Sequence, residues 1–382
     1  MKIIIAPDSF KESLSASRVA AALGTGVRRV FPDAELDLCP MADGGEGTVE
    51  AMVNATGGRF LTAPTCDPVG RPREAHFGLL GRGTSSLGPG AAAGQVAVIE
   101  MAAASGLELV PAGERNPMLT TTYGTGELIL AALEAGAREI LIGIGGSATV
   151  DGGCGCDQAL GVKFLRADGT PCACGLAGGG LTSIDRIELS ERDPRLLETR
   201  IRVACDVTNP LTGPEGAAAI FGPQKGATPE MVGQLDEGLH HLAEIIRQSL
   251  GVDVERMPGA GAAGGLGAGL VAFAGVRLER GIEIVAEAVG LADRIRGADL
   301  CITGEGRLDG QSAHGKTAVG VSRIAHAVGV PVICIPGQAS FDAPLEAFDA
   351  VYPLVNATTA VAEALAHPEK LLADRAAEAV RS

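Results

Sequence analysis

The chain has 382 residues, 46% of them hydrophobic, and carries 31 basic against 46 acidic side chains. This length predicts two domains rather than one core, and the net charge of −15 argues against a nucleic-acid or anionic-membrane surface. The first apolar run is too short for a signal peptide, and nine cysteines without such a signal favour a reducing compartment. We therefore expect a cytoplasmic protein.

The first 60 residues alternate strand, loop and helix. Residues 2–6 and 36–39 are predicted strands, and an amphipathic helix follows each of them after a loop. The loops, residues 7–13 and 41–48, stand at the carboxyl ends of strands, where open α/β sheets place their ligands. Both loops are therefore candidate site segments.

Between about residues 60 and 290 the pattern changes to strands and turns followed by mixed elements. Two predicted strands end in candidate site segments: 139–144 runs into Gly145-Gly146-Ser147, and 201–205 ends on Asp206. Further strands are predicted at 74–80 and 95–101, and helices at 126–135 and after Thr228-Pro229.

Residues 257–276 are uncharged, but Pro258 and seven glycines favour a glycine-rich loop and a buried helix over a membrane span. The spacings Cys154/Cys156 and Cys172/Cys174 could form a soft-metal site. Because no histidine flanks them, buried thiols are the preferred interpretation.

From about residue 290 the strand–loop–helix order returns, with strands at 300–303, 330–335 and 350–355. The order predicts an α/β fold of two α/β domains. Residues 1–60 plus 290–382 would form a discontinuous open-sheet (flavodoxin- or Rossmann-like) domain. Residues 61–289 would form an inserted α/β domain, with the active site in the cleft.

Residues 310–317, GQSAHGKT, match the P-loop pattern G-x-x-x-x-G-K-[ST]. A true P-loop begins directly at a strand end, whereas residues 304–309 separate the predicted strand from Gly310. These residues also place the acidic side chains of Glu305 and Asp309 where a phosphate would have to bind. A P-loop is therefore disfavoured. Lys316 at a predicted helix N-terminus is still a candidate for anion binding.

Acidic side chains beside glycine or at strand ends recur along the chain. Phosphoryl transfer uses carboxylates to hold Mg²⁺ and to accept a hydroxyl proton, and cations to neutralise transferring charge. A single Asp-Gly pair can be a simple turn, but this concentration at strand ends favours a site. The set comprises Asp8, Asp43, Glu46, Asp151, Asp206, Glu305 and Asp309, with Lys11, Arg307 and Lys316 as cations and Arg71 and Lys225 as further candidates.

Six segments carry a family resemblance: APDSFKESL at 6–14, PMADGGEGT at 40–48, TTYGTGEL at 121–128, GIGGSAT at 143–149, ACDVTNPL at 204–211 and TGEGRLD at 303–309. In this order they resemble the type I glycerate kinases. The resemblance implies ATP- and Mg²⁺-dependent phosphorylation of D-glycerate in the cleft of a two-domain α/β fold. The 2-hydroxyl is the expected acceptor, and 3-phosphoglycerate stays open as the product.

We use this resemblance to predict roles. The predicted catalytic residues are Asp206, Lys11 and Asp8, and the predicted substrate-binding residues are Arg71, Asn209 and Ser9. The residues predicted to bind ATP are Gly304, Gly306, Arg307, Lys316, Gly145, Gly146 and Ser147. The residues predicted to hold Mg²⁺ are Asp43, Glu46, Glu305 and Asp309.

The expected partners are D-glycerate and ATP, without nucleic acid or membrane, and a homodimer is left open. Two alternatives to the kinase remain at this point. One is a P-loop-type NTPase, and the other is a non-catalytic protein that binds a small acid.

Overall fold

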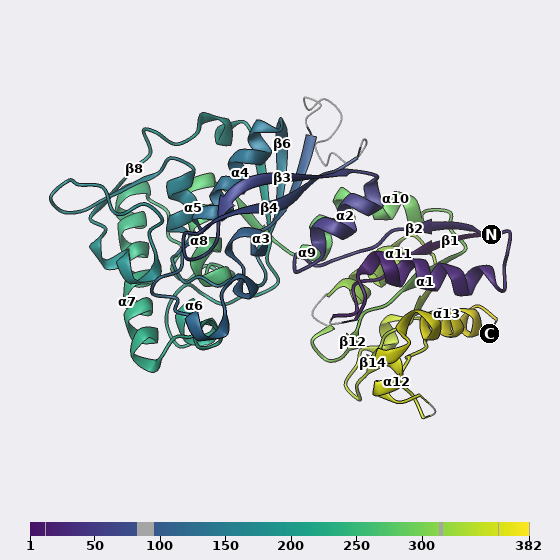
Figure 1. Ribbon diagram of the computed structural model, residues 1–382. Coiled ribbons are helices and arrows are strands. Elements are labelled where there is room, and N and C mark those ends of the chain that lie inside the picture. Colours follow the sequence, from purple (N-terminus) through teal and green to yellow (C-terminus); the bar gives the residue numbers. More distant parts are fainter. Residues whose placement is uncertain (12, 82–94, 313–315, 358, 382) are drawn as a thin grey trace.

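The computed structural model describes residues 1–11, 13–81, 95–312, 316–357 and 359–381. The chain forms two lobes, and both termini lie in the same lobe (Figure 1). We call this the terminal lobe and the other the inserted lobe. Each lobe has its own sheet, and together they confirm the predicted α/β fold.

The terminal lobe is built on a five-stranded parallel sheet of order β15-β13-β11-β1-β2. When these five strands are renumbered 1 to 5 in chain order, the sheet has the flavodoxin-like order 2-1-3-4-5. Its switch point lies between β1 and β11, and ligands bind at such a point. The strands are β1 (Lys2–Ile5), β2 (Glu35–Leu38), β11 (Leu300–Thr303), β13 (Val332–Cys334) and β15 (Ala350–Val351).

Helices cover both faces of this sheet. On one face α1 (Ala16–Arg28) packs against α13 (Pro368–Ala379), with Val19, Leu23 and Leu372 fully buried between them and the strands. The helices of the other face are α2 (Thr48–Thr56), α9 (Gly281–Ala288), α10 (Leu291–Ile295) and α11 (Thr317–Ala327). The lobe also contains α12 (Val361–Ala366), β12 (Arg307–Leu308) and β14 (Gln338–Ala339).

The inserted lobe is built on a six-stranded mixed sheet of order β10-β9-β6-β5-β4-β3. The pairs β3–β4 and β4–β5 are antiparallel and the others parallel. The strands are β3 (Arg59–Cys66), β4 (Pro72–Leu79), β5 (Gln95–Glu100), β6 (Ala137–Gly143), β9 (Arg200–Ala204) and β10 (Arg277–Glu279). Strand β3 was not predicted.

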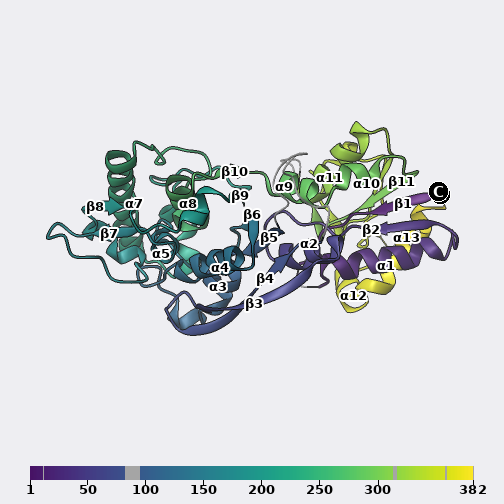
Figure 2. The same cartoon turned by 90° about the horizontal axis from the view of Figure 1, so that it is seen from above.

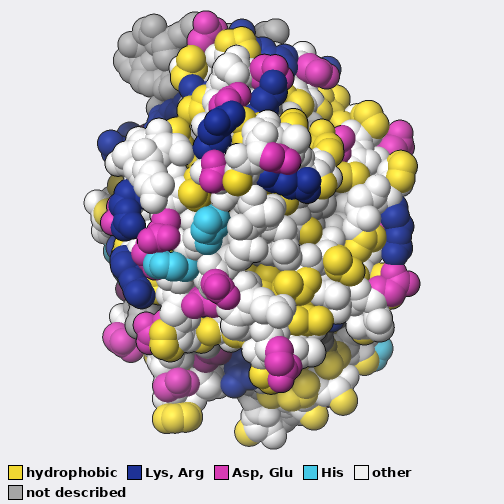
Figure 3. All heavy atoms as spheres, turned by 90° about the vertical axis from the view of Figure 1, so that its left-hand side faces the viewer, with side chains coloured by type: hydrophobic (Ala, Val, Ile, Leu, Met, Phe, Trp, Pro, Cys, Tyr) yellow, Lys and Arg dark blue, Asp and Glu magenta, His cyan; other side chains and the backbone are white. Residues whose placement is uncertain are grey.

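A helical layer completes the inserted lobe. Helices α4 (Tyr123–Glu134) and α8 (Leu266–Ala274) pack on the sheet, and α7 (Pro229–Leu250) lies beyond them with its own apolar cluster. The remaining elements are α3 (Ala102–Ser105), α5 (Cys154–Ala159), α6 (Ala217–Phe221), β7 (Lys163–Leu165) and β8 (Arg186–Glu188). On the outer face of this lobe, basic and acidic side chains are interspersed (Figure 3).

Helices α2 and α9 lie between the two lobes (Figure 2). One apolar cluster joins them to both sheets, because Met52 of α2 and Val285 of α9 are buried with Val98 of β5 and Cys301 of β11. The strands of the terminal lobe come from both chain ends, as the predicted discontinuous domain requires. The domain boundaries themselves stay a prediction. No helix among the described ranges has the length and apolar character needed to cross a membrane.

Candidate active site

Two pockets meet where β9 ends. The glycine-loop pocket has a volume of about 380 Å³, and the arginine pocket about 820 Å³. They share Cys205, Asp206 and Val207. The glycine-loop pocket is also lined by Asp43, Gly44, Gly45, Leu107, Ile144, Gly145, Gly146, Ser147, Ala204, Phe221, Gln224, Lys225, Ala262 and Ala263. The arginine pocket is also lined by Thr208, Asn209, Arg280, Gln311, Lys316, Val319 and Arg323.

Close backbone packing brings Asp43 to the end of the inserted sheet. Gly44 has φ +92°, and a Cβ there would lie 2.4 Å from the Ala204 Cβ. A Cβ on Gly143, the last residue of β6, would lie 2.3 Å from the Gly44 carbonyl oxygen. Glycine is therefore needed at both positions for the loop after β2 to cross the ends of β6 and β9.

Asp206 lies between the two lobes. Its Oδ1 accepts a hydrogen bond of 3.0 Å from the backbone N–H of Gly281, the first residue of α9. Desolvation raises the pKa of Asp206 to about 6, and the negative charge of Asp43 adds to this effect. The carboxylate is thus ionised near neutral pH and close to the value that favours proton transfer.

A second carboxylate cluster lies at the switch point of the terminal sheet. The Asp8 N–H donates to the Gly304 carbonyl (2.8 Å), and the Thr317 hydroxyl donates to Asp8 Oδ2 (2.5 Å). Glu305 is only 7% exposed, and its Oε1 has no hydrogen-bond partner within the described part of the chain. Burial, as the main cause, raises the pKa of Asp8 to about 6 and that of Glu305 to about 7.

These residues fit a magnesium ion. In the described ranges no three His, Cys, Asp or Glu side chains form a ready metal cage. Mg²⁺ in kinases is usually held by one or two carboxylates together with substrate phosphates and water, so such a cage is not required. The buried, unpartnered Oε1 of Glu305, beside the charge of Asp8, is a suitable oxygen donor.

Cations line the arginine pocket. Lys316 occupies the N-cap position of α11, the predicted helix N-terminus, and its Nζ donates to Gln311 Oε1 (3.2 Å). Arg280 and Arg323 line the same pocket. Asn209 also reaches it, with its amide nitrogen donating to the Glu215 carbonyl (2.8 Å). Positive side chains and a helix N-terminus in one pocket favour an anionic ligand.

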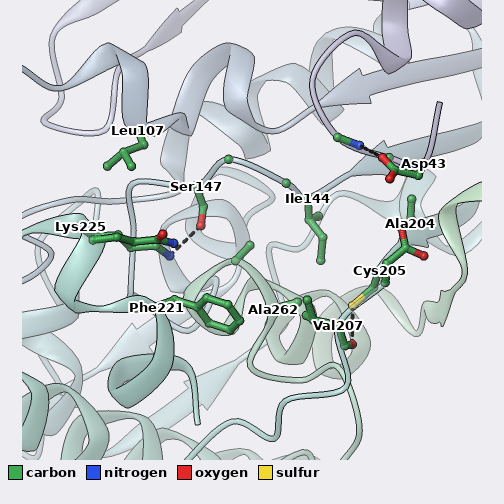
Figure 4. Close-up of a pocket in the computed structure, with 17 residues that line it drawn as sticks. Asp43, Leu107, Ile144, Ser147, Ala204, Cys205, Val207, Phe221, Lys225 and Ala262 are labelled. Atoms are coloured by element: carbon green, nitrogen blue, oxygen red, sulfur yellow. Dashed lines mark hydrogen bonds between the residues drawn. The ribbon is translucent and has the colours of Figure 1, made fainter. Parts of the chain in front are cut away.

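The glycine-loop pocket combines apolar walls with one buried cation (Figure 4). Gly145 and Gly146 are exposed in it, while Ser147 is buried. The Lys225 Nζ donates 2.7 Å hydrogen bonds to the Ser147 hydroxyl and to the Thr149 carbonyl. Lys225 and Ser147 lie at one side of the pocket, and Asp43 and Cys205 lie at the other (Figure 4).

Several predicted site residues lie outside both pockets. Arg71 is paired with Glu114 (2.5 Å), and Glu46 lines a separate depression of the surface. Lys11 is exposed beside Gly306, and Arg307 faces Asp309 at 3.5 Å. Ser9 and Gly304 belong with Asp8 at the switch point, where the Ser9 N–H donates to Asp8 Oδ1.

Thr317, Arg280, Arg323 and Phe221 are among the residues that were missed from the sequence. Thr317 could have been found, because it is the last residue of the P-loop pattern. Arg323 had no such signal, since it stands inside α11, and Arg280 stands between β10 and α9, where no strand was predicted. Lys225 was named only as a further cation, although the surrounding FGPQKG segment (221–226) is a visible turn signal.

An open sheet with carboxylates and cations gathered at strand ends defines an α/β enzyme that acts on small anionic ligands. A family model described as "Glycerate kinase family" matches residues 3–382. The chain therefore belongs to the glycerate kinase family.

Individual relatives agree with this assignment. The chain is 52% identical over 367 residues to "Glycerate 2-kinase" of Escherichia coli strain K12, covering 95% of this chain and 93% of the relative. It is 50% identical over 370 residues to "Glycerate kinase" of Bacillus subtilis strain 168, covering 96% and 94%. A crystal structure from Salmonella typhimurium LT2, provisionally assigned as glycerate kinase 2, superposes with TM-score 0.89 at 49% identity, covering 100% and 97%.

Proposed function

We propose that this enzyme transfers the γ-phosphoryl group of ATP to the 2-hydroxyl of D-glycerate, with Mg²⁺. The observation that supports the proposal is that two pockets share Asp206 in their lining, so that two ligands can approach the same carboxylate. The choice of the 2-hydroxyl rests on the printed name of the E. coli relative. The proposal places the enzyme in the cytoplasm, and a homodimer stays a prediction.

In the proposed reaction the hydroxyl oxygen of glycerate forms a bond to the γ-phosphorus. The bond from the γ-phosphorus to the oxygen that bridges it to the β-phosphorus breaks, and ADP leaves with that oxygen. The hydroxyl proton passes to the Asp206 carboxylate. Asp206 is suited to this role because it is ionised near neutral pH and is fixed by the Gly281 N–H.

Positive side chains neutralise the anionic ligands. Arg280, Lys316 and Arg323 line the pocket on one side of Asp206 and would bind phosphate or carboxylate oxygens. Glu305 and Asp8 would hold the metal ion. When bound, Mg²⁺ screens the charge of the phosphate groups.

The structure disfavours a P-loop mechanism. Strand β11 ends at Thr303, and the short strand β12 (Arg307–Leu308) stands between it and Gly310. The first glycine of the pattern therefore does not follow the buried strand directly, as a P-loop requires. Lys316 keeps its place at a helix N-terminus and so keeps its proposed role with phosphate.

Release of ADP, coupled to a spectrophotometric assay, tests the proposal. It is measured with D-glycerate, with L-glycerate and without acceptor, each at saturating ATP and Mg²⁺. We expect turnover that depends on D-glycerate and only slow ADP release without acceptor. Equal rates with and without acceptor would show an ATPase and would sink the kinase proposal.

A further inference from the structure

Lys225 is a buried cation that the proposed reaction has not used. It lies in the short 3-10 helix Pro223–Lys225, is 2% exposed and lines the glycine-loop pocket. Its Nζ donates to two neutral oxygens, Ser147 Oγ and Thr149 O, both at 2.7 Å. An ammonium group has three N–H donors. Within the described residues the third donor has no acceptor.

No carboxylate is paired with this lysine in the described part of the chain. The charge whose field acts on it is Asp151, which is itself buried. Among the described residues no hydrogen bond or ion pair joins Asp151 to Lys225, and the oxygens of Asp151 accept hydrogen bonds from Thr122, Gly153 and Gly155. A buried cation without a counter-ion costs stability, so its position at a pocket needs an explanation other than stability.

The surroundings are shaped for an anion. Ser147 continues from Gly145 and Gly146, which carry no Cβ and leave the backbone accessible from the pocket. Figure 4 shows the Lys225 nitrogen directed at Ser147, at the edge of the open space of the pocket. An anionic oxygen placed there would take the free donor of Lys225 without breaking either existing hydrogen bond.

We propose that Lys225 is the anion-binding residue of the glycine-loop pocket and contacts a negatively charged oxygen of a substrate, either the carboxylate of the organic acid or a phosphate of the nucleotide. This inference rests on the proposed kinase function, because it takes its two anionic ligands from that reaction. It adds a substrate-contacting residue at the side of the pocket opposite Asp43.

Binding of the anion has a measurable proton linkage. Burial lowers the pKa of Lys225 to about 7 in the free protein, so most molecules carry a neutral amine at pH 8. A contacting anion favours the charged form and raises this pKa. At pH 8 the complex should therefore take up protons as it forms, up to about one per site.

The test is isothermal titration calorimetry at pH 8 in Tris and in HEPES, whose ionisation enthalpies differ. The ligands are ADP with Mg²⁺ and D-glycerate, with adenosine and glycerol as uncharged counterparts. We expect proton uptake with one of the two anions and none with its uncharged counterpart. The anion that gives the uptake identifies the source of the oxygen.

Variants test the residue itself. Lys225→Met should abolish the proton uptake and weaken the binding of that anion about 10- to 100-fold. The control Lys370→Met, at an exposed position of α13, should change neither the uptake nor the affinity. Wild-type binding of both anions without proton uptake, or wild-type affinity in a folded Lys225→Met, would overturn the inference.

Failure of the proposed function looks different, because wild-type ADP release would then not depend on D-glycerate. The wild-type calorimetry needs no variant, so the inference can still be tested if Lys225→Met fails to fold.

Discussion

Among single residues, Asp206 is the one on which the proposed reaction depends most. Its carboxylate is held by the Gly281 N–H, lies between two pockets and is ionised near neutral pH. The hydrogen bond to α9 gives this residue a structural role as well, because a carboxylate stabilises the N-terminus of a helix. A substitution must therefore remove the ability of the side chain to accept a proton while it keeps the hydrogen bond to Gly281.

Asp206→Asn is the suitable change, since the amide oxygen can still accept the Gly281 N–H but the side chain cannot accept a proton. We expect kcat to fall by about 10²- to 10⁴-fold, while KM for D-glycerate changes by less than about threefold. Steady-state kinetics measure both. A kcat within threefold of wild type would remove Asp206 from proton transfer.

A second residue-scale prediction concerns stability and pH. Burial lowers the pKa of Lys225 from 10.5 to about 7 in the folded state. Between pH 7 and pH 10.5 the unfolded chain binds more protons at this group, so its contribution makes the folded state more stable as pH rises. Below pH 7 the full cost of burying the charge is present.

Lys225→Met removes this titration. The quantity of interest is the free energy of unfolding of the variant minus that of the wild type. This difference should be greatest at pH 6 and should decrease by about 3 kcal/mol by pH 9.5, because the wild type gains stability over this range. Urea unfolding at several pH values measures this difference, with Lys370→Met as the exposed control. A difference that does not vary with pH would contradict the depressed pKa of Lys225.

At the scale of elements, the loop between β2 and α2 controls where Asp43 lies. Gly44 and Gly47 have nearly the same backbone angle φ, +92° and +88°. A Cβ on Gly44 would clash with Ala204 at 2.4 Å, whereas a Cβ on Gly47 would meet nothing within 4 Å. The two glycines therefore separate the cost of the clash from the cost of backbone strain.

Gly47→Ala should cost about 1 kcal/mol through strain alone and leave KM and kcat close to wild type. Gly44→Ala should cost at least about 2 kcal/mol more and lower kcat/KM by more than tenfold, because the loop must leave the ends of β6 and β9. Chemical unfolding and kinetics of the pair measure this. Equal effects would mean that the close approach is not required.

The same elements show how much of the fold the sequence predicts. Buried parallel strands such as β11 are short apolar runs, and their predicted ranges lie within two or three residues of the observed ones, apart from β15, which is four residues shorter than predicted. Strand β3 was missed because it lies at the sheet edge, where Arg59 and Phe60 are exposed and Pro64 interrupts the pattern. Its pairing with β4 depends on a hairpin and not on local apolar content.

The candidate site was predictable only in part, for a similar reason. The loops that carry Asp8 and Glu305 follow β1 and β11, which are neighbours in the terminal sheet, so the sheet accounts for their convergence, whereas Asp206 follows β9 of the other sheet. The pairing of Arg71 with Glu114 and the burial of Lys225 depend on tertiary contacts between distant segments. No local pattern encodes such contacts.

At the scale of the whole molecule, the two lobes share one apolar cluster around α2 and α9. Arg202 of β9 adds an ionic contact across the same boundary, with its guanidinium 2.9 Å from Glu287 of α9. Within the inserted sheet the same guanidinium lies 2.6 Å from Glu279 of β10. Lobes with separate cores and a small polar interface would move and unfold independently. Because the apolar cluster is continuous between the lobes, we expect the two lobes to unfold together.

Calorimetry should thus show one unfolding transition for the wild-type protein. Met52→Ala, which removes a fully buried side chain of α2 from the shared cluster, should lower stability by about 2–5 kcal/mol without splitting the transition. Two separate transitions in the wild type would show that the lobes fold independently.

In the proposed reaction, phosphoryl transfer to a hydroxyl of D-glycerate takes place where the two pockets meet. Phosphorus NMR of the enzyme with ATP, Mg²⁺ and D-glycerate tests it most directly. We expect a new phosphomonoester signal coupled to one proton, since the 2-carbon of glycerate carries a single hydrogen. Coupling to two protons would place the group on the 3-hydroxyl, and inorganic phosphate without any monoester would rule out the proposed transfer.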